Sequence, residues 1–144
     1  MNSIERLEEK TIRKLKGKDR VKVVAARVGP AGELEFYETG GLDGSSFVKP
    51  AHEAPVIKVR TIPLLDILAE NRIGKIGGMK IDVEGFEDQV LVPFLEDAPD
   101  SLLPSCIVIE VCHNDDWKTD LKEKFLARGY RLEKQARANH IFVR

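Results

Sequence analysis

The sequence lacks several features that would assign a protein to a class directly. No apolar run approaches the ~20 residues needed to cross a bilayer, and the charged start MNSIERLEEK has no apolar core of a signal peptide. The 23 basic and 24 acidic residues give a formal net charge of −1, so no excess of one sign attracts nucleic acid or an anionic membrane. We therefore expect a cytosolic protein that binds neither.

Cysteine is also scarce. The two cysteines, Cys106 and Cys112, lie in the stretch CIVIEVC, and a strand there would hold them roughly 20 Å apart at about 3.3 Å per residue. They cannot form a disulfide with each other. With one nearby histidine, they match no zinc-site spacing. We expect reduced thiols and no metal site.

The first part of the chain predicts a helix followed by a hairpin. Residues 4–15 place Ile and Leu at spacings of three to five between charges, which is typical of an amphipathic helix. Residues 21–29 (VKVVAARVG) and 33–38 (ELEFYE) are two extended runs joined by the turn residues PAG. We expect these two runs to form an antiparallel pair.

The rest of the chain alternates between strand and helix patterns. Strands are expected at VIKVRT, GGMKIDV and SCIVIEVC, each followed by a helix, and RLEKQARA and HIFVR close the chain as two short strands. Pro93 should kink or restart the helix FEDQVLVPFLED. This order predicts one α/β domain over residues 1–144, a three-layer sandwich with a mainly parallel sheet and an antiparallel C-terminal edge. The apolar runs MKIDV and CIVIEVC should be adjacent parallel strands at its centre.

An acidic turn, DVEGFED over residues 82–88, closes the predicted strand MKIDV and carries four carboxylates. Ligands of open α/β sheets bind beyond the carboxyl ends of the parallel strands, which is where Asp82 and Glu84 would stand. Gly85 is expected to adopt a positive φ as the chain leaves the strand. Glu87 and Asp88 suit the first turn of the next helix, where the dipole favours anions, and are expected to be structural.

The neighbouring strand end carries a second polar group. CIVIEVCHND places Glu110 at the carboxyl end of its strand, with His113, Asn114 and Asp115 just beyond it. Such a set of side chains could orient a nucleophile, act as a general base or hold a hard cation. Taken alone, the acidic turn could equally be a helix cap, and a lone histidine such as His113 is more often a surface loop residue.

The stretch KIDVEGFEDQVL resembles the K-I-D-V-E-G-x-E motif of the FkbM-type methyltransferases, with Phe86 at the variable position. These enzymes use S-adenosylmethionine and mostly methylate hydroxyl groups of sugars, polyketides and other small molecules. Other segments are similar in order and spacing, so that the resemblance covers nearly the whole chain: RVKVVAARVGPAGELEFYE, GSSF, VRTIPLLDIL, IVIEVCH and FLARGYRLE.

The resemblance implies a Rossmann-like methyltransferase fold and places several residues at its active site. Asp82, Glu84 and Gly85 would line the active-site side of the sheet, with Glu87 supporting the turn and Glu110 at the next strand end. We accordingly predict Asp82, Glu84, Glu110 and His113 as catalytic, and Gly85 and Asn114 as contacts to a small-molecule hydroxyl acceptor.

The sequence does not contain the family's glycine-rich cofactor turn or the acidic residue that holds the ribose of S-adenosylmethionine. The glycines at 40–44 and 74–78 are no substitute, because GKIGG precedes a strand whereas a nucleotide-binding turn follows one. We therefore expect a domain truncated at its N-terminus, and assign no cofactor-binding residue. The sheet would then have a gap at its centre, and an exposed sheet edge that could pair with a second copy.

Three functions remain open at this point. The first is the C-terminal, substrate-side part of a methyltransferase that methylates a hydroxyl group of a small molecule or sugar. The second is a non-catalytic methyltransferase-like module that self-associates or binds a partner protein. The third is a Mg²⁺-dependent hydrolase using Asp82, Glu84 and Glu110, a set without a recognised ligand spacing.

Overall fold

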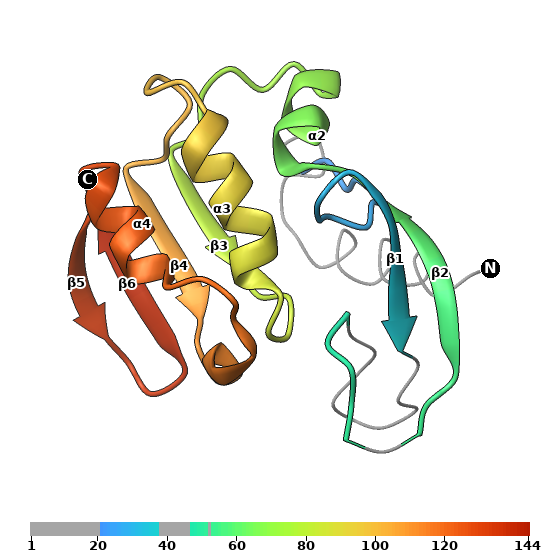
Figure 1. The fold of residues 1–144 in the computed structure, drawn as a ribbon. Helices are drawn as coiled ribbons and strands as arrows, with labels where there is room; N and C mark the ends of the chain where they lie inside the picture. Colours follow the sequence, from blue (N-terminus) through green and yellow to red (C-terminus); the bar gives the residue numbers. More distant parts are fainter. Residues whose placement is uncertain (1–20, 38–46, 52) are drawn as a thin grey trace.

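The computed structural model describes residues 21–37, 47–51 and 53–144, which form a mixed α/β fold with two sheets (Figure 1). The helix expected at residues 4–15 lies outside this range. In the described part, no helix is long and apolar enough to cross a membrane.

The larger sheet has four strands in the order β3-β4-β6-β5, with bounds Gly78–Ile81 for β3, Cys106–Glu110 for β4, Asn139–Val143 for β6 and Arg131–Gln135 for β5. Strands β3 and β4 are parallel, and β6 is antiparallel to both of its neighbours. The adjacent parallel pair and the antiparallel C-terminal edge were thus predicted correctly. The central position of β3 was not, because β3 is an edge strand among the described residues. The prediction of a mainly parallel sheet was also wrong, because two of the three strand pairs of this sheet are antiparallel.

Helices α3 (Glu87–Asp97) and α4 (Leu121–Ala127) cover one face of this sheet (Figure 1). Alternate residues of β4 point into this core, so Ile107 and Ile109 are buried whereas Cys106, Val108 and Glu110 on the other face are half-buried. The Phe125 ring of α4 stacks on Phe142 of β6, with centroids 4.2 Å apart. Each fully buried side chain of this size contributes about 1.5–3 kcal/mol. The second helical layer of a three-layer sandwich stays a prediction.

Helix α3 runs without a break through Pro93, so the proline does not restart it. Pro93 is half-buried on the helix surface, whereas its neighbours Phe94 and Leu95 are buried in the core. Burial of this apolar face stabilises the helix enough to accommodate the missing amide donor.

The smaller sheet is a pair of antiparallel strands, β1 (Gly32–Tyr37) and β2 (Val56–Thr61), followed by helix α2 (Leu64–Glu70). The predicted pairing of residues 21–29 with β1 is wrong. Residues 21–27 form no strand, and Val28 makes only an isolated bridge with Ile62. The valines of residues 21–27 are 38–45% exposed. The pairing of β1 with β2 instead leaves Val59 and Thr61 of β2 buried.

A chain of aromatic rings joins the two sheets. Phe47 lies between Phe36 of β1 and Phe86 at the start of α3, with centroid distances of 5.1 and 4.8 Å. Aromatic pairs at such distances add about 0.5–1.5 kcal/mol beyond their buried area. The hairpin is therefore anchored next to the acidic turn.

Candidate functional site

The acidic turn between β3 and α3 has an unusual backbone. Glu84 has φ 52° and Gly85 has φ 89°, which confirms the positive φ predicted for the glycine. A Cβ at position 85 would also lie 3.1 Å from Cβ of His113 and 3.3 Å from both a carboxylate oxygen of Asp116 and a methyl of Val48. Glycine is therefore required here by conformation and by space. The left-handed conformation of Glu84 carries a modest backbone cost that glycine would not have.

Two carboxylates of the turn are buried and serve the structure, as the sequence predicted. Glu87 accepts hydrogen bonds from the backbone N–H of Val83 at 2.9 Å and of Gly85 at 3.1 Å, and from Trp117 Nε1 at 2.9 Å. These donors satisfy a charge that would otherwise be costly to bury. Glu87 thus fixes both the turn and the loop that carries Trp117.

Asp88 anchors the same loop one step further on. Its Oδ2 accepts hydrogen bonds from the backbone N–H groups of Lys118 at 2.8 Å and Thr119 at 3.2 Å. Sequence reasoning missed this connection, because the partners lie 30 or more residues apart. The helix dipole is therefore only part of the reason for these two acids.

Three predicted site residues meet at the carboxyl ends of β3 and β4. His113 Nδ1 lies 3.5 Å from Glu84 Oε2 and 3.8 Å from Glu110 Oε2. The side chains of His113 and Glu84 are half-exposed, whereas that of Glu110 is 13% exposed. Glu110 Oε2 is buried and has no hydrogen-bond donor among the described residues. We call this group the Glu84–His113–Glu110 cluster.

The other predicted site residues lie outside this cluster. Asp82 forms an exposed ion pair with Lys80, an interaction worth about 1 kcal/mol or less. Asn114 begins the short 3-10 helix η2 (Asn114–Asp116) and lines a separate pocket of about 410 Å³. Gly85 contributes through its close contact with His113.

Cys112 adds a thiol next to the cluster. Interaction of its S–H group with the Glu110 carboxylate is the main cause that raises the pKa of this thiol, although no donor in the described part of the chain lies within hydrogen-bond distance of Oε2. Partial desolvation and the negative charges of Glu110, Glu84 and Asp82 act in the same direction. The protonated form therefore dominates at neutral pH, so Cys112 is a poor nucleophile there.

The described residues contain no group of three or more His, Cys, Asp or Glu side chains placed to hold a metal ion. The Mg²⁺-dependent hydrolase considered from the sequence required Asp82, Glu84 and Glu110 to converge on one cation. Asp82 instead pairs with Lys80. The geometry of these residues gives that function no support.

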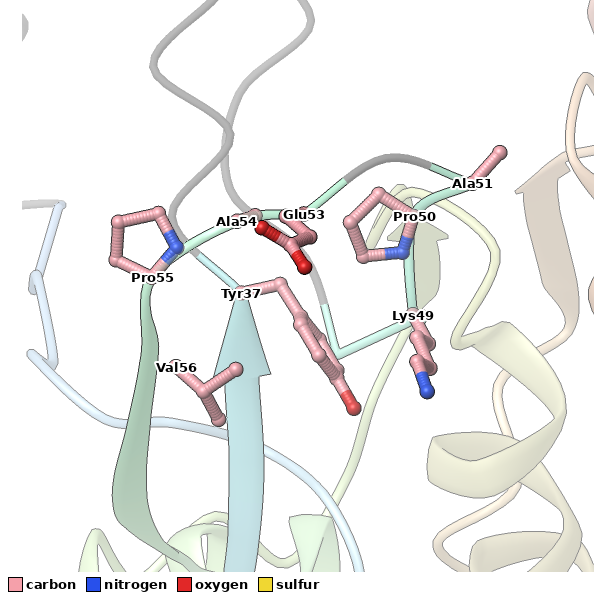
Figure 2. Close-up of a pocket in the computed structure, with 8 residues that line it drawn as sticks. All are labelled: Tyr37, Lys49, Pro50, Ala51, Glu53, Ala54, Pro55 and Val56. Carbon is pink, nitrogen blue, oxygen red and sulfur yellow. The ribbon is translucent and has the colours of Figure 1, made fainter.

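A second surface pocket, of about 580 Å³, lies at the end of the hairpin (Figure 2). The Tyr37 ring stands between the side chains of Val56 and Lys49, with Glu53 nearby (Figure 2). The Tyr37 hydroxyl donates a hydrogen bond to Glu35 at 2.8 Å, which raises the pKa of Tyr37. Lys49 and Glu53 carry opposite charges, so the lining favours neither an anionic nor a cationic ligand.

Comparison with known proteins places the chain in a family. A family model described as the methyltransferase FkbM domain matches residues 6–132. No curated protein and no solved structure gives a significant match. Because the matched range spans most of the 144 residues, the chain belongs to the FkbM methyltransferase domain family.

Proposed function

We propose that the chain forms the acceptor side of an S-adenosylmethionine-dependent methyltransferase that acts on a hydroxyl group of a small molecule or sugar. Family membership supports methyl transfer. The observation that carries the proposal is the buried, unsatisfied Glu110 Oε2, which lies 3.8 Å from His113 Nδ1 at the end of a parallel strand. A buried carboxylate oxygen without a donor is costly, and such groups concentrate at functional sites.

The Glu84–His113–Glu110 cluster can remove a proton from the acceptor. A hydroxyl group loses its proton when its oxygen is methylated, and a placed base typically contributes ~10² to 10⁴ in rate. With a proton on Nδ1 facing the two carboxylates, His113 keeps the lone pair of Nε2 for the proton of the acceptor. Glu84 and Glu110 then stabilise the imidazolium. The distances of 3.5 and 3.8 Å are longer than hydrogen bonds, and catalytic contacts of this kind commonly shorten on substrate binding.

S-adenosylmethionine supplies an electrophilic methyl group when bound, but the described residues do not form a cradle for it. Gly85 is the glycine that follows a strand and opens a helix, the position where a cofactor turn would stand. Its open side is filled by His113, Asp116 and Val48. We therefore propose that the cofactor is held chiefly by residues other than those described.

Calorimetric titration with S-adenosylmethionine tests whether the cofactor is held by residues other than those described. We expect no micromolar binding by the 144-residue chain, and binding by a longer protein if the reading frame continues upstream into a glycine-rich turn. Methyl transfer by that protein to a panel of hydroxylated small molecules tests the reaction itself. Micromolar binding by the chain alone would contradict the assignment of the cofactor site, and transfer to no hydroxyl acceptor would contradict the function.

A non-catalytic module is the second candidate, and the edge position of β3 favours it. In the described part of the chain, β3 pairs only with β4, so its other edge is available to a strand of another chain or a second copy. Light scattering during size-exclusion chromatography separates the two candidates. A concentration-independent monomer with methyl-transfer activity would exclude this alternative.

We also propose that the protein acts in the cytosol. The free thiols of Cys106 and Cys112 would stay reduced there. Fractionation of cells that produce the protein would test this proposal, and recovery of the protein from an oxidising compartment would contradict it.

A further inference from the structure

The pocket lined by Asn114 lies on the helix-covered side of the larger sheet, at the carboxyl end of β4. The buried side chains of Ile109 and Phe142 form its base, and the loop after β4 supplies Asn114 and Trp117. Its volume of about 410 Å³ falls within the range of small-molecule sites. We call it the Asn114 pocket.

Basic residues outnumber acidic ones in the lining of this pocket. Lys118 and Lys122 both line it, and neither ammonium forms an ion pair within the part of the chain that the structure describes. Lys80 and Lys124, by contrast, pair with Asp82 and Glu96. The two unpaired ammonium groups therefore favour an anionic ligand.

The one acidic side chain among the residues lining the Asn114 pocket is already engaged. Asp120 Oδ1 accepts a hydrogen bond from the backbone N–H of Lys122 at 2.8 Å, as the N-cap of α4. Within the lining, one acidic residue thus stands against two basic ones. The carboxylates of Glu87 and Asp88 lie behind Trp117 and Lys118, where the indole and backbone N–H groups engage them.

The remaining polar and aromatic groups suit an organic ligand rather than a bare inorganic ion. Burial lowers the pKa of His140, and the positive charge of Lys122 lowers it further, so the ring is neutral at pH 7 and offers one donor and one acceptor. The indole N–H of Trp117 is bound to Glu87, which leaves the ring of Trp117 for apolar contact.

We propose that the Asn114 pocket binds the acidic group of the methyl acceptor, so that the acceptor is a small organic acid such as a sugar bearing a carboxylate or a phosphate. This rests on the proposed function. Asn114 lines the pocket, whereas the preceding residue, His113, belongs to the Glu84–His113–Glu110 cluster. The loop after β4 therefore supplies both sites, so that an acceptor lying along this loop would place its acid group in the pocket and its hydroxyl group at the cluster.

Nuclear magnetic resonance titrations test the proposal without cofactor or turnover. Glucuronate and glucose 6-phosphate serve as the carboxylate and phosphate probes, and glucose is the neutral control of similar size. We expect both acids, but not glucose, to shift the signals of the Trp117 indole N–H and the His140 ring. The acid that binds more tightly identifies the preferred anion.

A matched pair of double variants shows whether the two lysines are responsible. Lys118→Gln with Lys122→Gln should weaken acid binding by about tenfold or more, since both charge-assisted contacts are lost. Lys58→Gln with Lys75→Gln removes the same charge from exposed positions elsewhere and should leave binding unchanged. Backbone spectra of all variants verify folding.

Equal binding of glucose and the two acids, or unchanged affinity in the Lys118/Lys122 double variant, would overturn the inference. The outcome is separable from that of the proposed function. Methylation of neutral sugars without acid binding would leave the proposed function standing and reject the acidic acceptor. Acid binding without methyl transfer to any hydroxyl group would support the acid site and reject the proposed function.

Discussion

The four carboxylates of the acidic turn fall into two pairs with opposite environments. Glu87 and Asp88 are at most 1% exposed and accept hydrogen bonds from the turn and from the loop that follows β4. Asp82 and Glu84 are about half-exposed, and they lie beside the side chains of Lys80 and His113, respectively. Residues of the same chemical type thus divide into a pair that holds the site together and a pair available for chemistry. Hydrogen-bond partners, not residue type, distinguish the two roles.

The largest effect on stability is expected from Glu87→Ala. This change leaves three N–H donors without their acceptor in a buried place, and we expect a loss of about 4 kcal/mol in the free energy of unfolding. Glu84→Ala is the matched control, because it removes an exposed carboxylate of the same turn, and it should cost less than about 1 kcal/mol. Urea unfolding measures both. Similar midpoints for the two variants would remove the distinction between the pairs.

The largest effect on rate is expected from His113→Ala. In a protein that binds cofactor, kcat/KM should fall by at least about 100-fold, while the melting temperature changes little because the side chain is half-exposed. Glu84→Gln should lower the rate more than Asp82→Asn, since Glu84 lies beside His113 whereas Asp82 pairs with Lys80. Rates within about threefold of the parent for all three variants would show that the exposed pair is scaffolding as well.

An intermediate effect is expected at the residue between the two pairs. Gly85→Val should destabilise the fold by about 3 kcal/mol, because a β-branched residue resists φ 89° and its Cβ would press on His113. Phe86→Leu keeps an apolar side chain with an ordinary backbone conformation but loses the ring contact with Phe47, and should cost less, about 1–2 kcal/mol. Equal melting temperatures of the two variants would contradict the structural role of Gly85.

The smallest effect concerns the thiol beside the cluster. Because its pKa is raised, Cys112 should react slowly with iodoacetamide at pH 8, where an ordinary cysteine is partly thiolate. Glu110→Gln removes the carboxylate that is the main cause of the raised pKa and should speed alkylation several-fold. Glu84 raises this pKa only through its negative charge, so Glu84→Gln should speed alkylation less. The rates are measured by mass spectrometry in a Cys106→Ser background. No acceleration in Glu110→Gln would contradict the contact between Glu110 and Cys112.

Strands and helices from β3 onward followed from sequence because each carries its own periodic apolar pattern. The pairing of β1 was not predictable in the same way. Residues 21–29 have as good an apolar pattern as β2, and only the folded structure shows that Val21, Val23 and Val24 stay exposed. Pairing between strands separated by a long connection depends on what each strand buries, which a local pattern does not record.

The site was predictable to the same extent. The convergence of Glu84, Glu110 and His113 followed from the rule that parallel strands end at one edge of a sheet. The bond from Trp117 to Glu87 and the lysines of the Asn114 pocket did not, because they depend on how the loop after β4 folds back onto α3. No local signal in the sequence specifies that path.

The hydrogen bond between Trp117 and Glu87 gives the protein a built-in optical probe. Trp117 is the sole tryptophan of the sequence, so intrinsic fluorescence at long excitation wavelengths reports on one place. Its N–H is tied to the carboxylate that fixes the acidic turn, and its ring lines the Asn114 pocket. The emission of the unlabelled chain therefore follows, in a single signal, both the integrity of the turn and the arrival of a ligand beside it.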